Sequence, residues 1–221
     1  MGINAQAFAE IETALDRAHG PQHWRRHGDP LDELIGTVLS QHTSDINTAR
    51  AFASLKSVFP EWGLVAAAPT DDVAQAIRGG GLANVKAPRI QRILDEVDER
   101  LGDFDLSIIE EWSLDNARAF LTSLPGVGPK TAACVLLFSM GLPAMPVDTH
   151  VHRIALRTGM IPECTNAERA HGILEERLGE DRDRVYALHM NLIAHGKRVC
   201  HARHPQCEAC VIVTWCERNG V

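Results

Sequence analysis

The chain has 221 residues, of which 45% are hydrophobic, and a formal net charge of −7. This length and composition suffice for one or two domains with a packed core and exclude a disordered chain. The N-terminus lacks the basic start and apolar stretch of a signal peptide, and the most apolar segment, 131–147, is too short to span a bilayer. We therefore expect a cytoplasmic protein with no membrane partner. The negative net charge alone argues against a nucleic-acid partner, although phosphate binding depends on where the cations lie.

Apolar residues recur at helical spacing along the chain, and no segment alternates strictly as a strand would. Asp29 followed by Pro30 predicts a helix start, because proline is tolerated in the first turn. Three glycines at 79–81 predict a break, and residues 141–146 predict another. An all-α fold follows. Three apolar stripes are expected in the core: Leu31, Leu34, Ile35, Val38 and Leu39; Ile90, Ile93, Leu94, Val97 and Leu101; and Val185, Leu188, Leu192 and Ile193.

Residues 124–132, Leu-Pro-Gly-Val-Gly-Pro-Lys-Thr-Ala, separate two expected helices at 114–123 and 129–140. The two glycines allow a tight turn and a close approach of the backbone to a ligand. The unpaired N–H groups at the start of the second helix form a natural anion site. Lys130 lies in that first turn. A surface lysine is usually solvated and inert, but the positive end of a helix disfavours the ammonium and favours a nucleophilic amine.

Asp148 lies in Pro-Val-Asp-Thr-His, residues 146–150, where the local pattern alone predicts a helix N-cap. Further on, Cys200, Cys207, Cys210 and Cys216 are spaced C-x6-C-x2-C-x5-C. Four thiolates this close suit a tetrahedral zinc ion or an iron–sulfur cluster, and coordination chemistry does not separate the two. Two disulfides are the alternative, which a cytoplasmic location disfavours. Cys134 lies in an apolar helix and is expected to be a small core residue.

These motifs together resemble the endonuclease III family of the helix-hairpin-helix (HhH-GPD) DNA glycosylases, over nearly the whole chain from Leu31 to Cys216. The resemblance implies a two-domain fold: a six-helix barrel over residues 30–142, and a discontinuous iron–sulfur cluster domain formed by 1–29 and 143–221. It implies a [4Fe-4S] cluster on the four cysteines and a monomer, associated with the nucleoid if the host is bacterial. The implied activity is that of a bifunctional DNA glycosylase/AP lyase, which removes oxidised pyrimidines from damaged double-stranded DNA and nicks the strand by β-elimination.

The resemblance also implies roles for individual residues. Lys130 would attack the sugar and Asp148 would assist, both in a groove between the domains. The hairpin would hold a DNA phosphate through the backbone of Gly126, Val127 and Gly128. Apart from the resemblance, the basic residues around the cysteine loop are expected to contact phosphate, Arg203 first and then Lys197 and Arg198. The gap left by an extruded base would be filled by Leu82 on one side and by Gln41 or His42 on the other.

Two departures and two rival hypotheses remain at this stage. The alignment with the family places the residue that fills the gap from the second side, the wedge, at His42, with Gln41 one position early. Pro129 replaces a basic residue that is common before the lysine. A monofunctional mismatch or alkylation glycosylase could use the same scaffold, although Lys130 speaks against it. A non-catalytic DNA-binding module that uses the hairpin and a zinc site is the rival from another class.

Overall fold

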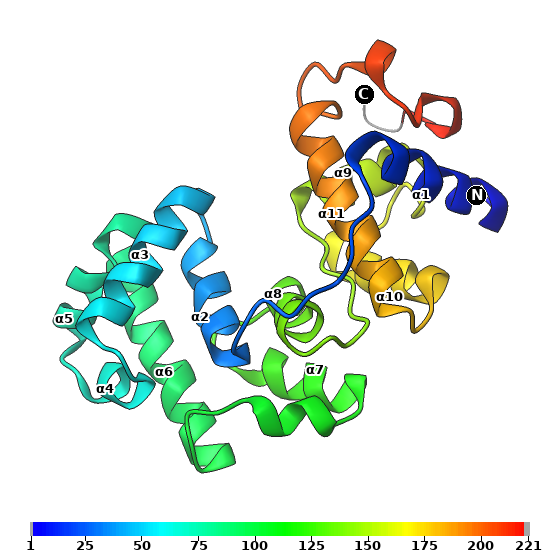
Figure 1. The fold of residues 1–221 in the computed structure, drawn as a ribbon. Helices are drawn as coiled ribbons and strands as arrows, with labels where there is room; N and C mark the ends of the chain where they lie inside the picture. The colour runs from blue at the N-terminus through cyan, green and yellow to red at the C-terminus, as the bar shows by residue number, and fades with distance from the viewer. Residues whose placement is uncertain (1, 219–221) are drawn as a thin grey trace. The chain divides into compact units, whose positions relative to one another are not determined.

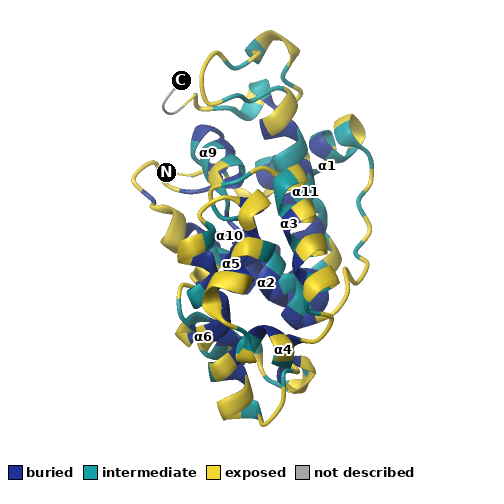
Figure 2. Cartoon of the chain, turned by 90° about the vertical axis from the view of Figure 1, so that its left-hand side faces the viewer, coloured by how far each residue is buried: buried dark blue, intermediate teal, exposed yellow. Residues whose placement is uncertain are grey.

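The structure is a computed structural model that describes residues 2–218. Over this range the chain is all-α, with short 3-10 turns, one π-helical segment and no strand, as predicted. It divides into two compact units: residues 26–140, here called the hairpin unit, and residues 2–25 with 141–218, here called the cysteine unit (Figure 1). In both, buried residues concentrate on the inward faces of the helices (Figure 2). No helix in the described part is long and apolar enough to cross a membrane.

The hairpin unit is built around α2 (Pro30–Ser40), which packs against α3, α6 and α8. The predicted apolar stripe of α2 is fully buried, which confirms it as core. The other elements of the unit are α3 (Asp45–Val58), α4 (Trp62–Ala67), α5 (Thr70–Ala76), η1 (Arg78–Gly80), α6 (Ala83–Leu101), η2 (Ser107–Glu111), α7 (Leu114–Ser123), α8 (Pro129–Cys134) and η3 (Val135–Ser139).

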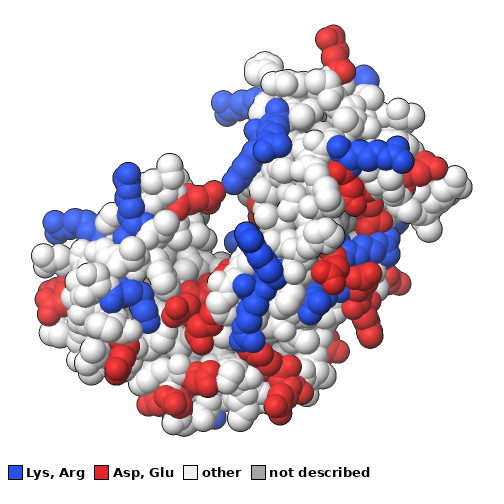
Figure 3. Space-filling model, in the orientation of Figure 1, with Lys and Arg blue, Asp and Glu red and all other residues white. Residues whose placement is uncertain are grey.

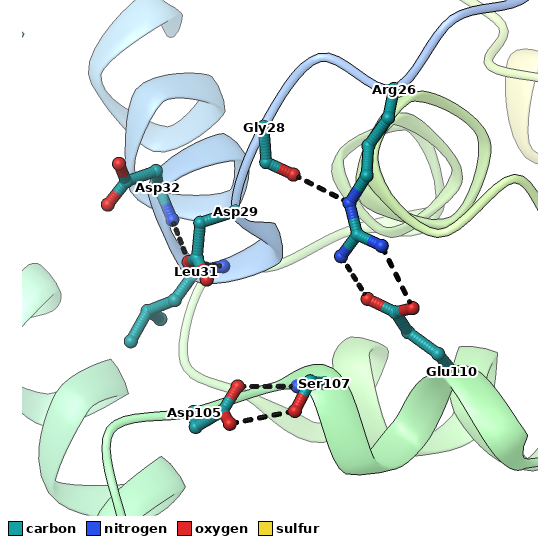
Figure 4. Close-up of polar contacts among 8 residues, drawn as sticks. All are labelled: Arg26, Gly28, Asp29, Leu31, Asp32, Asp105, Ser107 and Glu110. Carbon is teal, nitrogen blue, oxygen red and sulfur yellow. Dashed lines mark hydrogen bonds and ion pairs between the residues drawn. The ribbon is translucent and has the colours of Figure 1, made fainter.

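The start of α2 follows the prediction from Asp29 and Pro30. The Asp29 carboxylate accepts hydrogen bonds from the backbone N–H groups of Leu31 (2.8 Å) and Asp32 (3.1 Å), and Pro30 occupies the first turn. Just before this cap, Arg26 donates to both carboxylate oxygens of Glu110 in η2 (Figure 4). The cap and the ion pair together fix how the chain enters the unit.

The helix expected over residues 129–140 changes type midway. It is α-helical to Cys134 and π-helical over η3, where the N–H of Met140 donates to the carbonyl of Val135 at 3.3 Å. Every residue from Thr131 to Ser139 is buried, including Cys134 as predicted. A π segment widens the helix locally and is often found at functional sites. The segment α8–η3 is thus a core helix with its first turn at the surface.

One buried cation connects two loops of the hairpin unit. Lys86 in α6 is 2% exposed, and its ammonium donates to the carbonyls of Leu39 (2.6 Å) and Gly80 (2.9 Å). Leu39 lies in the last turn of α2, and Gly80 ends the turn before α6. Burial lowers the pKa of Lys86. The Lys86 side chain therefore donates hydrogen bonds to two carbonyls at helix ends, where carbonyls generally lack a donor within the helix.

The cysteine unit combines both ends of the chain. Its helix α11 (Arg182–Arg198) packs against α1 (Ala5–His19) and α9 (Thr149–Arg157), and α10 (Ala167–Leu178) packs against α9 and α11. The predicted stripe of α11 is buried except for Ile193, which is only partly covered, as Leu101 is in α6. Beyond α11 the chain forms a loop with two turns, η4 (Cys207–Ala209) and η5 (Val213–Trp215). The indole of Trp215 donates to Glu10 of α1 at 2.9 Å.

Replacing Lys86 with methionine tests the buried cation. The substitution keeps the length of the side chain but leaves two buried carbonyls without a donor, so we expect the free energy of unfolding to fall by about 3 kcal/mol. Urea denaturation followed by circular dichroism measures the change. The matched control is Arg92→Met, an exposed position on the same helix, with an expected change below about 0.5 kcal/mol. Equal midpoints for the two variants would contradict the proposed role of Lys86.

Candidate functional site

The segment between α7 and α8 forms a tight hairpin. The N–H of Val127 donates to the carbonyl of Leu124 at 3.1 Å, and Gly126 has a φ of +73°, which favours glycine. The Val127 side chain is buried and anchors the turn. Within the described residues, no backbone or side-chain acceptor is found for the N–H groups of Gly126 and Gly128. Of the three predicted phosphate-binding positions, the two glycines therefore present their amides, whereas the amide of Val127 closes the turn.

Arg89 of α6 locks this hairpin to the loop after α2. A Cβ atom at Gly126 would lie 2.7 Å from Cδ and Nε of Arg89, so the close packing also requires glycine. The guanidinium donates to the side-chain oxygen of Gln41 at 2.9 Å, and the Gln41 amide donates to the carbonyl of Gly126 at 3.5 Å. The Gln41 side chain is thus engaged in positioning the hairpin.

Lys130, in the first turn of α8, lines a cavity of about 500 Å³ that lies within the hairpin unit. Cavities of this size hold small organic ligands. The remaining wall comes from the segment before α2, one face of α2, the first part of α3, and η3. Cys134, predicted as a core residue, also contributes to this wall. Lys130 therefore follows the glycines of the hairpin in the chain and lines a pocket in the same unit.

One wall of the cavity is polar and comes from α2, the helix that also carries the buried apolar stripe. Glu33 and Thr37 lie one turn apart on α2, and the Thr37 hydroxyl donates to the Glu33 carboxylate at 3.4 Å. Burial raises the pKa of Glu33, and the hydroxyl and the nearby Lys130 oppose that shift. Next to it, the His27 ring stacks on Phe138 at 4.7 Å between ring centroids and an interplanar angle of 11°. Sequence reasoning missed these residues; the signal was a polar pair at helical spacing in an apolar helix.

The predicted wedge loops both carry non-glycine residues in the left-handed region. Leu82 has a φ of +52° and is 53% exposed, and His42 has a φ of +57° and is also exposed. Such conformations cost about 1 kcal/mol or more and are kept where the surroundings impose them. Lys86 supplies that constraint, because it binds the carbonyls of Leu39 and Gly80 next to the two loops. Between the two candidates after α2, His42 is the exposed one.

Asp148 is the N-cap of α9, where its carboxylate accepts a hydrogen bond from the N–H of Val151 at 2.8 Å. The capping role considered from the sequence is thus confirmed. Asp148 belongs to the cysteine unit, whereas Lys130 belongs to the hairpin unit. The catalytic role of Asp148 stays a prediction.

The four predicted cysteine ligands line one small cavity in the cysteine unit. Buried Arg157 donates to Sγ of Cys200 at 3.3 Å, and Sγ of Cys216 lies 3.2 Å from the Arg157 carbonyl oxygen. Arg153 donates to the Cys200 carbonyl at 2.8 and 3.0 Å, so α9 holds the start of the cysteine loop at two points. Burial, with a smaller contribution from the neighbouring thiols, raises the pKa of Cys210.

The arrangement of these thiols bears on the kind of metal group they could hold. Within residues 2–218, no three His, Cys, Asp or Glu side chains converge on a point where one metal ion could bind. Four thiols around a common cavity are the ligand type of both zinc ions and iron–sulfur clusters. The buried guanidinium of Arg157 suits the negative charge of such a group.

The predicted basic residues are exposed. Lys197 and Arg198 end α11, and Arg203 lies in the loop between the first two cysteines. Acidic and basic side chains are both present on the face drawn in Figure 3, so the net charge of −7 does not describe every part of the surface. Their contact with phosphate stays a prediction.

Comparison with known proteins adds independent findings. Residues 35–179 match the family model of the HhH-GPD superfamily base excision DNA repair protein. The chain is 36% identical to endonuclease III of Thermotoga maritima over 86% of its own length and 83% of that protein. It is 37% identical to an Arabidopsis thaliana protein over 76% of its length but spans only 56% of that relative. A solved structure of a trapped endonuclease III–DNA covalent intermediate matches with a TM-score of 0.84 and 25% identity, over 98% of this chain and 97% of that one.

The family model covers more than half of the chain, and the Thermotoga relative is similar over most of both lengths. The all-α fold, the hairpin followed by Lys130 and the gathered C-terminal cysteines agree with these matches. The chain belongs to the HhH-GPD superfamily of base excision DNA repair glycosylases and is endonuclease III-like.

Proposed function

We propose that the protein is a bifunctional DNA glycosylase and AP lyase that removes oxidised pyrimidines from duplex DNA and nicks the strand. The observation that carries the proposal is the position of Lys130: it lines a pocket of about 500 Å³ and follows the hairpin glycines, whose amides have no acceptor among the described residues. A phosphate held by those amides brings a nucleotide to the lysine without requiring a positive net charge.

In the proposed reaction, the damaged nucleotide leaves the base stack and the Lys130 amine attacks C1′ of its sugar. The bond from C1′ to the base nitrogen breaks, and the base departs with its electron pair and a proton. The sugar ring opens to a Schiff base with the lysine. Loss of a proton from C2′ then expels the 3′ phosphate oxygen, which breaks the strand, and water releases the lysine. The Asp148 carboxylate stabilises the positive charge that develops on the sugar.

Base extrusion requires side chains that fill the vacated space, and the two strained loops present them. We propose Leu82 for one strand, because an exposed leucine in a left-handed conformation has no packing role that explains it. For the other strand we propose His42, because the neighbouring Gln41 is tied to Arg89 and Gly126. Lys197, Arg198 and Arg203 would contact flanking phosphates.

Cys200, Cys207, Cys210 and Cys216 would hold a [4Fe-4S] cluster, which ties the C-terminal loop at four points and supplies structural stability rather than chemistry on the sugar. The thiol arrangement and the buried Arg157 support this assignment. The cluster would fix the loop that carries Arg203, so the expected consequence of its loss is weaker DNA binding.

Two other functions lack one or both of the proposed steps. A monofunctional glycosylase on the same scaffold would release the base through water and leave the strand intact. A non-catalytic DNA-binding module would do neither. The position of Lys130 in the cavity wall favours the bifunctional enzyme over both.

The Schiff base gives the decisive test. Borohydride should reduce it to a stable covalent adduct between the protein and DNA that contains an oxidised pyrimidine or an abasic site, but not with undamaged duplex. Lys130→Gln should abolish the adduct and the nick while DNA binding persists, since backbone amides make the phosphate contact. Gel electrophoresis reports the adduct, and fluorescence anisotropy reports binding. Release of free base by the wild type without any adduct would favour the monofunctional rival.

Asp148→Asn keeps the size of the side chain and most of its capping ability but removes the charge. Excision under single-turnover conditions should fall by about 10²-fold or more, as expected when a charged catalytic group is lost. The melting temperature should change little, and Asn166, an asparagine that already caps α10, shows that the amide serves this geometry. Unchanged turnover would leave Asp148 with its capping role alone.

The metal assignment predicts a yellow-brown protein with broad absorbance near ~400 nm, as thiolate-bound iron–sulfur clusters show. Cys207→Ser should lower this absorbance, the solubility and the DNA affinity. Exposed Cys164 provides the matched control, because Cys164→Ser should leave all three unchanged. Colourless, active protein with one equivalent of zinc would overturn the assignment.

A further inference from the structure

The cavity beside Lys130 has a polar wall that the chemistry of the lysine does not use. Glu33 and Thr37 come from the face of α2 that borders the cavity, and the Glu33 side chain keeps 23% of its surface exposed. A largely buried acidic side chain in the wall of a pocket is costly unless it has a task or a partner. Glu33 has weaker contacts than the neighbouring carboxylates of the same wall.

Two other carboxylates of the same wall are already occupied. Asp29 accepts from two backbone N–H groups of α2. Asp32 accepts from the indole of Trp62 at 3.0 Å and lies 3.7 Å from the ammonium of Lys56. The contacts of Glu33 are longer: 3.4 Å to the Thr37 hydroxyl and 3.9 Å to Nδ1 of His27. Its carboxyl group therefore retains capacity for a hydrogen-bonded ligand in the cavity.

The same cavity is also lined by two aromatic rings. His27 and Phe138 both line the cavity, and their rings are stacked at 4.7 Å. Flat rings beside a directional polar group are the combination by which proteins bind nucleobases: the rings stack on the base, and the polar group reads its edge. Lys130 lies in the wall of the same cavity, where the sugar of such a base would have to reach it.

We infer that this cavity receives the extruded base and that the Glu33 carboxyl group reads its pairing edge, favouring pyrimidines that carry an exocyclic amine over pyrimidines that carry an imide. The inference rests on the proposed base excision and adds the class of base. An amino group donates to a carboxyl oxygen, as in known contacts of glutamate with cytosine. The imide edge instead presents one N–H between two carbonyl oxygens, which repel a carboxylate.

The charged form of Glu33 carries this preference. A carboxylate only accepts hydrogen bonds, so it fits an amino group that donates, whereas a neutral acid would present a donor and an acceptor and fit either edge. Burial raises the pKa of this carboxyl group, and the Thr37 hydroxyl and the nearby Lys130 oppose that shift and favour the carboxylate.

The test compares duplexes that carry 5-hydroxycytosine or 5-hydroxyuracil at one position, since these lesions differ only at the pairing edge. We expect wild-type protein to excise 5-hydroxycytosine about tenfold faster in single turnover, the effect of one discriminating contact. Glu33→Gln presents a donor and an acceptor that fit either edge, so the ratio should fall to within about twofold. Glu99→Gln, an exposed position on α6, should keep the wild-type ratio.

Cleavage of a duplex with an abasic site separates this inference from the proposed function. Such a substrate has no base to read, so the rate at which Glu33→Gln cleaves it measures any effect of the substitution on Lys130, and the melting temperature reports folding; the ratio of the two lesions remains the readout for Glu33. A wild-type ratio near one, or a wild-type ratio retained in Glu33→Gln, would overturn the role of Glu33. If the wild type cleaves no abasic site, the lyase proposal fails; fluorescence anisotropy with the two lesion duplexes then decides the inference, and equal dissociation constants would overturn it.

Discussion

The buried ammonium of Lys86 is the contact on which the exposed loops after α2 and before α6 depend. It binds the last turn of α2 and the turn before α6, so it positions the loops that carry His42 and Leu82. One turn further along α6, Arg89 binds Gln41 and packs against Gly126. A single helix thus fixes three loops that are far apart in the sequence. Without such contacts the three loops would not stay ordered, because ordering each loop costs conformational entropy.

This support has to be strong because the supported loops are strained. Leu82 and His42 occupy left-handed conformations that their side chains disfavour, and both remain exposed. Without the contacts of Lys86 and Arg89, the loops would relax toward ordinary backbone angles. The hairpin unit therefore has strained backbone at its surface, and polar contacts beneath the surface hold that backbone in place.

In the cysteine unit, polar contacts likewise hold a loop in place, here around the four thiols. Two arginines of α9 hold the first cysteine through its carbonyl and its sulfur, and Arg157 is buried beside the other thiols. Thiols whose pKa is raised by burial do not ionise readily on their own. A metal group that binds them as thiolates would supply the missing positive charge, and Arg157 would offset the excess negative charge of four thiolates.

Local patterns in the sequence determined the helices, the start of α2 at Asp29, the glycine hairpin before Lys130 and the gathered cysteines, because spacing and caps act over a few residues. The cavity wall of Glu33, His27 and Phe138 was not predicted. Its residues come from a connecting segment, α2 and η3, and only packing brings them together. The sequence aligned the wedge with His42 but left Gln41 as an alternative. Tertiary structure gives the two residues different surroundings, because Arg89, distant along the chain, binds Gln41, while His42 is exposed. Periodicity reports which face of a helix is apolar, but which distant side chain reaches a given loop depends on how the helices pack.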